Sequence, residues 1–267
     1  MTMPGTIRFE DGAAYERYMG KWSQSVAVRL LDWLAPPPGW RWLDVGCGNG
    51  AFTEILGERC APGALHGIDP SDAQLAFARS RPVSRFARFT AGNAMALPFP
   101  EDRFDAAVMP LVISFVPRPA TGVGEMARVV RPAGLVAAYI WDTAGGGFPY
   151  ETLHNELRSR GVAVPAPPSP EVSRKEVLGA LWAEAGLVDV ETRVFEVQRI
   201  FENFEDYWET IFGAPSVGST LAGMGAAELA RLNAGLREKL PIESDGRLIL
   251  KARANAVRGT VPGKRRA

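Results

Sequence analysis

The chain has 267 residues, 46% of them hydrophobic, so it is long enough to bury a substantial core. Thirty lysine and arginine residues balance thirty aspartate and glutamate residues, which leaves no overall basic field to attract nucleic acid. The two cysteines lack metal-ligand spacing, the N-terminal stretch is polar, and no apolar run approaches the roughly 20 residues of a membrane span, which together predict a cytoplasmic protein without a metal site.

The first predicted element is a helix from Ala13 to Leu34, where apolar residues recur at helical spacing until the prolines at 36–38 end it. Strands and helices then alternate up to Asp142, a pattern typical of a doubly wound α/β fold that binds its ligand at the carboxyl ends of parallel strands. The expected strands are Arg41–Val45, Ala64–Ile68, Phe86–Ala91, Phe104–Pro110 and Gly134–Trp141. The expected helices are Phe52–Arg59, Asp72–Arg79 and Ala120–Val130.

Beyond Asp142 this alternation stops. Glycines 145–147 and the proline-rich stretch 164–170 predict loops. The expected elements after them are a helix at Lys175–Ala185, a strand at Val188–Phe201, a mostly helical stretch at Phe204–Leu240 and a last strand at Leu248–Val257. The helical stretch is too long for a simple connecting loop.

The most informative motif is a glycine turn, Gly46-x-Gly48-x-Gly50, directly after the first expected strand. Glycine has no Cβ, so the backbone can turn sharply there and a ligand can approach closely. Asp44 precedes the turn, where a carboxylate repels a pyrophosphate and attracts an ammonium group. Asp69 ends the next strand, where an acid can accept the hydroxyls of a ribose. The spacing differs from the dinucleotide fingerprint G-x-G-x-x-G, and S-adenosylmethionine carries both a ribose and an ammonium.

The runs Leu43–Gly50 and Gly67–Ser71 resemble the class I S-adenosylmethionine-dependent methyltransferases. Within them, the chain is similar to the small-molecule group that includes the ubiquinone and menaquinone biosynthesis C-methyltransferases. Gly92–Phe99 resembles the segment that contacts adenine in this family, Phe104–Val108 its fourth strand, and Glu125–Gly134 the helix and turn before its fifth strand.

Two positions depart from the family pattern. Asn93 stands where the family usually has aspartate, although an amide can still accept a hydrogen bond from the exocyclic amine of adenine through its carbonyl oxygen. Ala133 precedes Gly134 where the family often has a second glycine, which is a small backbone change.

The resemblance implies a Rossmann-like, doubly wound α/β sheet of seven strands, mostly parallel with an antiparallel hairpin at one edge, plus a small helical cap. The predicted organisation is a single methyltransferase domain, 1–267, with an N-terminal cap segment 1–35, a cofactor-binding core 40–142, a substrate cap 143–185 and 203–240, and closing strands 187–201 and 246–258.

The predicted cofactor-binding residues are Asp44, Gly46, Cys47, Gly48, Gly50, Asp69, Pro70, Ser71, Gln74, Asn93, Ala94, Met95 and Leu111. Two of these have an alternative structural role: Asp44 could order the glycine turn through its backbone N–H groups, and Ser71 could cap the following helix. Ordinary packing is the alternative for Leu111 and for Cys47.

The predicted substrate-binding residues are aromatic or apolar: Tyr15, Tyr18, Met19, Trp22, Phe115 and Trp141. Residues of this kind at helical spacing also pack simply in a core. Methyl transfer chiefly requires alignment of the two reactants, so no catalytic residue is assigned. His154 and Tyr150 are the candidate bases for an acidic acceptor, with a surface position as the alternative for His154.

The prediction is therefore an S-adenosylmethionine-dependent methyltransferase acting in line on a small, apolar or aromatic acceptor. A non-catalytic protein that binds S-adenosylmethionine and an NAD(P)-dependent oxidoreductase are the alternatives. Nucleic acid is not expected as a partner, because Met109–Val112 stands where enzymes that methylate a flipped amino group carry an Asn-Pro-Pro-aromatic tetrad. The methylated atom, the pathway and the oligomeric state stay open.

Overall fold

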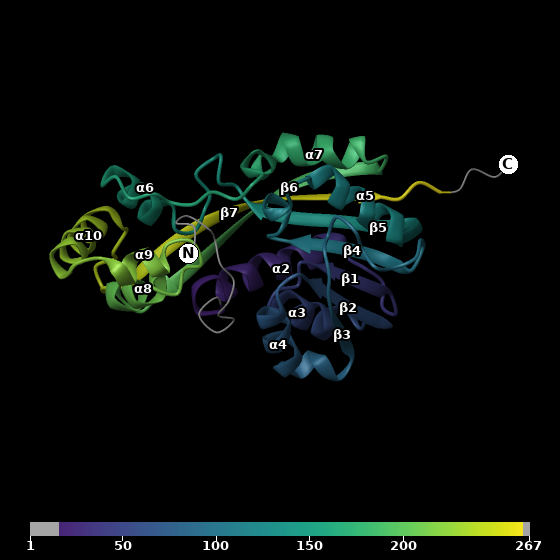
Figure 1. The fold of residues 1–267 in the computed structure, drawn as a ribbon, viewed down its shortest axis with the longest axis horizontal. Coiled ribbons are helices and arrows are strands. Elements are labelled where there is room, and N and C mark those ends of the chain that lie inside the picture. Colours follow the sequence, from purple (N-terminus) through teal and green to yellow (C-terminus); the bar gives the residue numbers. More distant parts are fainter. Residues whose placement is uncertain (1–15, 264–267) are drawn as a thin grey trace.

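A seven-stranded sheet organises residues 16–263, the part of the chain that the computed structural model describes (Figure 1). The strands are β1 (Arg41–Val45), β2 (Ala64–Asp69), β3 (Ala87–Ala91), β4 (Phe104–Pro110), β5 (Val130–Trp141), β6 (Val188–Phe201) and β7 (Leu248–Thr260). Their order is β3-β2-β1-β4-β5-β7-β6, and β7 runs antiparallel to both of its neighbours while the other pairs are parallel. The predicted fold class is thus confirmed.

Helices connect and cover these strands. They are η1 (Glu16–Gly20), α2 (Lys21–Leu34), α3 (Ala51–Cys60), α4 (Asp72–Ser80), η2 (Pro82–Arg85), η3 (Ile113–Phe115), α5 (Pro119–Val129), α6 (Glu151–Ser159), η4 (Pro170–Ser173), α7 (Lys175–Glu184), α8 (Phe204–Ile211), α9 (Gly218–Gly223) and α10 (Ala226–Lys239). Within residues 16–263, no helix combines the length and the apolar character needed to cross a membrane.

The order of the strands reverses at β1, which pairs with β2 on one side and with β4 on the other. Asp44 lies in register with Gly67 of β2 and with Val108 of β4. The connections from β1 and from β4 leave the sheet in opposite directions at such a point, which opens a crevice at the carboxyl ends of the strands. The sheet therefore places the glycine turn at the position where open α/β folds bind their ligands.

Alternate side chains of the central strands face two separate hydrophobic cores. Ala106 and Val108 of β4 belong to the core that includes α2 and α3, whereas Ala107 and Met109 belong to the core that includes α5 and α7. This period-2 alternation is what a strand buried on both faces requires. The parallel part of the sheet is therefore a rigid base for the crevice.

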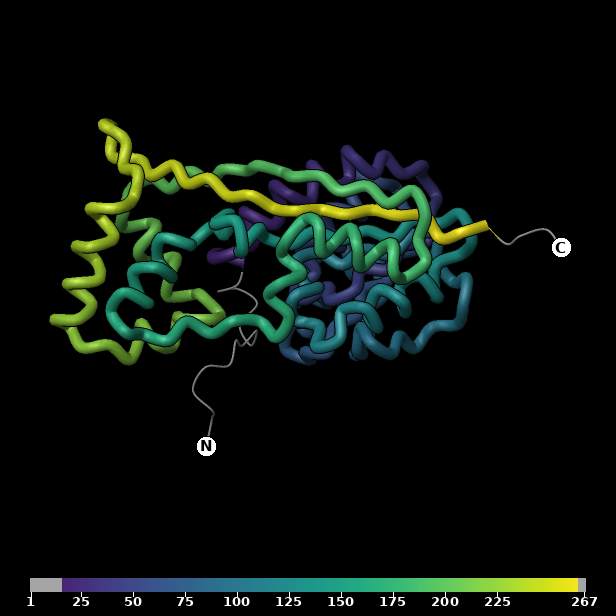
Figure 2. Tube along the Cα trace, turned by 90° about the horizontal axis from the view of Figure 1, so that it is seen from above, coloured from purple at the N-terminus to yellow at the C-terminus, as the bar shows by residue number. Residues whose placement is uncertain are grey.

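Strands β6 and β7 are longer than the parallel strands and form a hairpin that extends beyond them. Figure 2 shows the two running side by side along this length. Helices α6, α8, α9 and α10 gather around the extended end of the hairpin, at the left of Figure 1, away from β1–β3. These elements come from the segments that the sequence predicts as a substrate cap.

Several boundaries differ from the sequence prediction. The N-terminal helix comprises a π-helical turn, η1, followed by α2, and the predicted start at Ala13 lies outside the described residues. Strand β5 begins at Val130, which pairs with Phe104 ahead of a register shift in β4, and not at Gly134. Strand β7 continues to Thr260 because it pairs along β5 as far as Leu135.

Candidate functional site

The glycine turn after β1 is held in shape by the end of β2. Gly46 donates its backbone N–H to the carbonyl oxygen of Ile68 at 2.7 Å, and Gly48 donates to Oδ2 of Asp69 at 2.9 Å. The other carboxylate oxygen of Asp69 accepts the N–H of Ser71 at 2.8 Å. Two backbone donors thus fix the Asp69 carboxylate at the mouth of the crevice, and each oxygen keeps acceptor capacity for a ligand.

Gly46 is the glycine of this turn that the structure constrains most. Its φ is +75°, and a Cβ added there would lie 2.5 Å from Cγ2 of Val112. We expect Gly46→Ala to lower the free energy of unfolding by about 2–4 kcal/mol, because left-handed backbone strain and overpacking add. Urea unfolding measures this change.

Gly146→Ala is the matched control, since Gly146 also has positive φ (+73°) but no atom within 4 Å of the added Cβ. It should cost only about 1 kcal/mol. Equal losses in the two variants would show that the contact with Val112 is unimportant.

Asp44 is fully buried beneath the turn. Its Oδ2 accepts a hydrogen bond from Oγ1 of Thr53 at 2.6 Å, while Oδ1 has no partner among the described residues. The alternative prediction that Asp44 orders the turn through backbone N–H groups is therefore wrong, and Asp69 has that role. Burial is the main cause that raises the pKa of Asp44 to about 7, and the charge of Asp69 adds to it.

A cavity of about 360 Å³, here called the turn cavity, opens above these carboxylates. Twelve of the predicted cofactor-binding residues line it: Asp44, Gly46, Cys47, Gly48, Asp69, Pro70, Ser71, Gln74, Asn93, Ala94, Met95 and Leu111. Gly50 does not line it; this residue is the N-cap of α3, and a Cβ added there would lie 3.1 Å from Cβ of Ala78. Sequence reasoning thus found half of the 24 residues of this wall, and the contact of each residue with a cofactor stays a prediction.

The charge of the turn cavity is one-sided. Of the described residues that line it, Asp44 and Asp69 are carboxylates and none is lysine, arginine or histidine. Burial also raises the pKa of Asp69, which shows that its charged form is partly desolvated. The cavity therefore suits a ligand with a cationic group and opposes a pyrophosphate.

Two polar residues of this cavity also have local partners. Ser71 caps α4, because its Oγ accepts the backbone N–H of Gln74, so the structural alternative for Ser71 is confirmed. The side-chain carbonyl of Asn93 accepts the N–H of Met95 at 2.8 Å. This bond fixes the amide at the edge of the cavity while its oxygen retains a second lone pair.

A second cavity of about 510 Å³, here called the aromatic cavity, adjoins the first. Leu111 and Phe115 line both, so these two side chains form the boundary between them. Leu111 has φ +59° and donates its N–H to the carbonyl oxygen of Tyr139 at 2.8 Å, which fixes its strained backbone at the end of β4. Ligands bound in the two cavities would therefore face each other across this boundary.

Four of the predicted substrate-binding residues line the aromatic cavity: Tyr18, Met19, Phe115 and Trp141. Tyr15 lies outside the described residues. Trp22 lines neither cavity, because it is completely buried and its Nε1 donates to the hydroxyl of Tyr150 at 3.3 Å. Its aromatic character reflects core packing, the alternative that the sequence left open.

The two candidate bases have different surroundings. Tyr150 lines neither cavity; its hydroxyl donates to the carbonyl oxygen of Tyr18 at 2.6 Å, and burial raises its pKa. The candidate role of Tyr150 as a base is thus contradicted by its position. His154 lines the aromatic cavity, where its ring stacks on Phe148 with centroids 4.8 Å apart.

His154 is buried, so the alternative of a surface position is wrong. Its Nε2 has no hydrogen-bond partner among the described residues, and the same holds for Nε1 of Trp141 in this cavity wall. Burial is the main cause that lowers the pKa of His154 to about 4. The ring is therefore neutral near pH 7, and it can donate or accept one hydrogen bond at each nitrogen.

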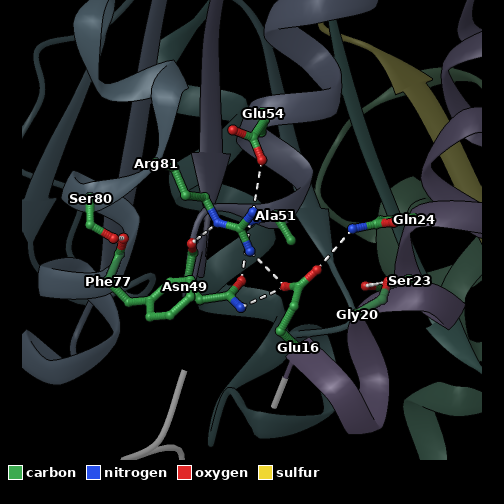
Figure 3. Close-up of polar contacts among 10 residues, drawn as sticks. All are labelled: Glu16, Gly20, Ser23, Gln24, Asn49, Ala51, Glu54, Phe77, Ser80 and Arg81. Carbon is green, nitrogen blue, oxygen red and sulfur yellow. Dashed lines mark hydrogen bonds and ion pairs between the residues drawn. The ribbon is translucent and has the colours of Figure 1, made fainter. Parts of the chain in front are cut away.

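Sequence reasoning missed three kinds of residue at this site. Thr53 holds Asp44 from across the turn, and Glu16 contacts the turn from the N-terminal segment (Figure 3). The wall of the aromatic cavity also carries the charged residues Arg158, Glu171 and Arg174. No spacing in the sequence links Thr53 or Glu16 to this site, since their partners lie on other elements. Among the described residues no cluster of three His, Cys, Asp or Glu side chains could hold a metal ion.

A glycine turn after β1, an acid at the end of β2 and a sheet closed by an antiparallel hairpin define a Rossmann-like fold with a nucleoside-type site. Residues 43–138 match the model of a family described as "Methyltransferase domain". A ubiquinone/menaquinone biosynthesis C-methyltransferase from Ruegeria sp. (strain TM1040) is 34% identical over 109 residues, which cover 39% of this chain and 44% of that protein. Residues 43–138 of this chain thus form a methyltransferase domain of the class I S-adenosylmethionine-dependent type.

Other relatives are similar over longer stretches. A malonyl-[acyl-carrier protein] O-methyltransferase from Halorhodospira halophila is 33% identical over 68% of this chain and 61% of its own length. The chain thus spans about half the length of the curated relatives that it matches.

Solved structures show the same fold at low sequence identity. A putative methyltransferase from Bacillus halodurans has a TM-score of 0.59 at 17% identity and covers 89% of this chain and 99% of its own. A phosphoethanolamine N-methyltransferase from Haemonchus contortus, solved with S-adenosyl-L-methionine, has a TM-score of 0.56 at 17% identity and covers 98% of this chain and 61% of its own.

Proposed function

We propose that this protein transfers the methyl group of S-adenosylmethionine, bound in the turn cavity, to a small apolar or aromatic acceptor in the aromatic cavity. The observation that carries the proposal is the pair of adjoining cavities with Leu111 and Phe115 in both walls. Two reactants held in them would meet at this boundary, and such alignment is the largest contribution that a protein makes to transfer from an activated donor.

The residues of the turn cavity fit the cofactor. Asp69 offers fixed carboxylate oxygens to the ribose hydroxyls, and the unpartnered Oδ1 of Asp44 offers a counter-charge to the ammonium group. Asn93 and Met95 line the same cavity and belong to the segment that resembles the adenine-contacting segment of the family. The bound cofactor would supply a methyl group already activated by its sulfonium, so the protein needs to bind, orient and exclude water.

The composition of the aromatic cavity supports a small-molecule acceptor over nucleic acid. Its inner wall includes Tyr18, Phe115, Trp141 and Phe148, and the charges lie on residues of α6 and η4 and on Arg174. One relative is a C-methyltransferase and another is an O-methyltransferase, so the family resemblance leaves the methylated atom open. We include in the proposal that the segments 1–35, 143–185 and 203–240 cap the acceptor, and that the protein acts in the cytoplasm.

The two alternatives are less well supported. An NAD(P)-dependent oxidoreductase would have to place a pyrophosphate beside Asp44 and Asp69 without a basic residue in the described wall. A non-catalytic protein that binds S-adenosylmethionine would not require a second cavity next to the first. Transfer to an acceptor gives both cavities a role.

Calorimetric titration with S-adenosylmethionine, S-adenosylhomocysteine and NADH tests the cofactor. We expect micromolar binding of the first two and none of NADH. A panel of phenols, carboxylic acids, amines and activated carbon acids, assayed for S-adenosylhomocysteine release, then tests transfer. Binding of NADH alone would favour the oxidoreductase, and cofactor binding with no turnover on the whole panel would favour the non-catalytic protein.

We propose that His154 recognises the acceptor as a neutral hydrogen-bonding group. For an acceptor with a hydroxyl, we expect His154→Phe to reduce kcat/KM about tenfold, the cost of one lost hydrogen bond, without changing the affinity for S-adenosylhomocysteine. The pKa of about 4 means that His154 produces no change of activity between pH 6 and 8. His66→Phe, in β2, is the control; a pH–rate limb near 6.5 that disappears only in His154→Phe would contradict the neutral role.

A further inference from the structure

The short segment Glu16–Gly20 lines the aromatic cavity and contacts a wall residue of the turn cavity. It forms a π-helical turn, η1. Such turns are rare in proteins, and those that occur are often found at functional sites. Tyr18 and Met19 belong to the wall of the aromatic cavity, whereas the carboxylate of Glu16 contacts Asn49, a wall residue of the turn cavity. One five-residue element thus touches the surroundings of both ligands.

Glu16 accepts hydrogen bonds from the neutral side chain of Asn49, in the glycine turn, and from the charged side chain of Arg81 (Figure 3). Its Oε2 accepts from Nδ2 of Asn49 at 2.9 Å and from the Arg81 guanidinium at 2.6 Å. Its Oε1 accepts from Nε2 of Gln24 at 2.9 Å. An added Cβ at Gly20 would lie 2.6 Å from the Glu16 carboxyl carbon, so the carboxylate folds back over its own turn.

Arg81 and Asn49 carry this contact into the turn cavity. Asn49 lies between Gly48 and Gly50 and lines the cavity, and it is only 2% exposed. Arg81 donates from Nε to the carbonyl oxygen of Asn49 at 2.6 Å and from a terminal nitrogen to Glu54 at 2.7 Å. Because this guanidinium side chain is only 12% exposed, its ion pair with Glu16 is screened less than a surface pair.

The other end of η1 is fixed against the cap. The ring of Tyr18 stacks on Tyr150 with centroids 4.1 Å apart, and its carbonyl oxygen accepts from the Tyr150 hydroxyl at 2.6 Å. Arg199 of β6 donates to the same carbonyl at 3.1 Å. A shift of the glycine turn would therefore displace residues in the wall of the acceptor site.

We infer that Glu16 is a positioning residue that couples occupancy of the turn cavity to the shape of the aromatic cavity. A ligand that orders Asn49 strengthens the contact with Glu16, which holds Tyr18 and Met19 in the wall. By linkage, an ordered wall favours the ligand to the same extent. The inference rests on the proposed function in one respect only, that S-adenosylhomocysteine binds in the turn cavity.

Hydrogen exchange of the full chain, with and without saturating S-adenosylhomocysteine, tests the coupling. In the unmodified protein we expect the ligand to slow exchange both in residues 46–50 and in residues 17–24. In Glu16→Ala it should slow exchange in residues 46–50 only, and the Kd should rise three- to tenfold. Glu16→Gln keeps the shape and part of the hydrogen bonding, so it should restore part of the protection in residues 17–24.

Two further variants separate coupling from simple stability. Arg81→Gln removes the partner and should uncouple residues 17–24 in the same way, whereas Glu58→Gln on the exposed face of α3 should behave like the unmodified protein. Ligand binding that protects residues 46–50 but leaves residues 17–24 unchanged in the unmodified protein would overturn the coupling and leave the proposed function standing. Full protection of residues 17–24 in Glu16→Ala would overturn it too. No binding of S-adenosylhomocysteine to the unmodified protein would overturn both.

Discussion

Asp69→Ala is expected to weaken binding of S-adenosylmethionine and S-adenosylhomocysteine roughly 30- to 1000-fold. The change removes the acceptor that the ribose would use, and it also frees the N–H groups of Gly48 and Ser71 that shape the site. Losing a charged acceptor with several donors costs about 2–4 kcal/mol, which corresponds to roughly 30- to 1000-fold in affinity. Calorimetric titration of both ligands measures the effect.

Asp72→Ala is the control for this variant, because Asp72 is an exposed carboxylate in the first turn of the next helix, α4. It should change the free energy of unfolding by less than about 1 kcal/mol through the helix dipole and leave affinity unchanged. An Asp69→Ala protein that is folded by circular dichroism and binds S-adenosylhomocysteine normally would disprove the ribose assignment.

Asp44→Asn is expected to stabilise the ligand-free protein and to weaken its binding of S-adenosylhomocysteine. The folded-state pKa of about 7 exceeds the unfolded value of 3.8, so the native state favours the protonated acid. That contribution to stability is complete below about pH 4 and is lost as the pH rises through 7. The neutral amide avoids this loss, so above pH 7 the ligand-free variant should be more stable, by at most about 4 kcal/mol, the free energy equivalent of the two pKa values.

The affinity of Asp44→Asn for S-adenosylhomocysteine should fall, because the amide offers no charge to the ammonium group. We expect a loss of at least tenfold at pH 8, where the carboxylate is ionised, and a smaller loss at pH 5.5, where Asp44 of the free unmodified protein is protonated. Binding near pH 7 should release a fraction of a proton from the unmodified protein only, which titrations in two buffers of different ionisation enthalpy detect.

The same substitution at the exposed Asp72 controls for the general loss of a charge. Asp44→Asn that binds as tightly as the unmodified protein at pH 8 would remove Asp44 from the cofactor site. A stability difference that shrinks as the pH rises from 4 to 8 would show that burial does not raise its pKa.

The two adjoining cavities contain buried polar groups that a ligand can satisfy. The turn cavity has two desolvated carboxylates and no described basic residue, while the aromatic cavity has a buried neutral histidine and an unpartnered indole N–H. Burying each of these polar groups costs free energy until a complementary ligand forms a hydrogen bond or ion pair with it. Leu111 and Phe115, which separate the two, are consequently the side chains whose size should set the acceptor geometry.

Local patterns in the sequence determined the parallel core and the turn cavity. Strands β1, β2 and β4 carry short apolar runs, and the glycines and Asp44 lie within nine residues of one another, so their chemistry is readable from neighbours along the chain. The end of β2 then contributes Asp69 because parallel strands bring their carboxyl ends to one edge. For this reason twelve of the thirteen predicted cofactor-binding residues line the turn cavity, and Gly50 alone of them does not.

Only the tertiary structure decided the rest. Trp22, Tyr150, Tyr18 and Trp141 are all aromatic, so the sequence does not distinguish them. Packing between distant segments buries Trp22 and Tyr150 behind the wall of the aromatic cavity, whereas Tyr18 and Trp141 line it. The same packing joins Glu16 to Arg81, 65 positions away, and leaves Nε2 of His154 without a hydrogen-bond partner among the described residues. Helical and strand periodicity determine which side of an element is apolar. They do not determine which other element packs against that side, and the acceptor site is formed by these packing contacts.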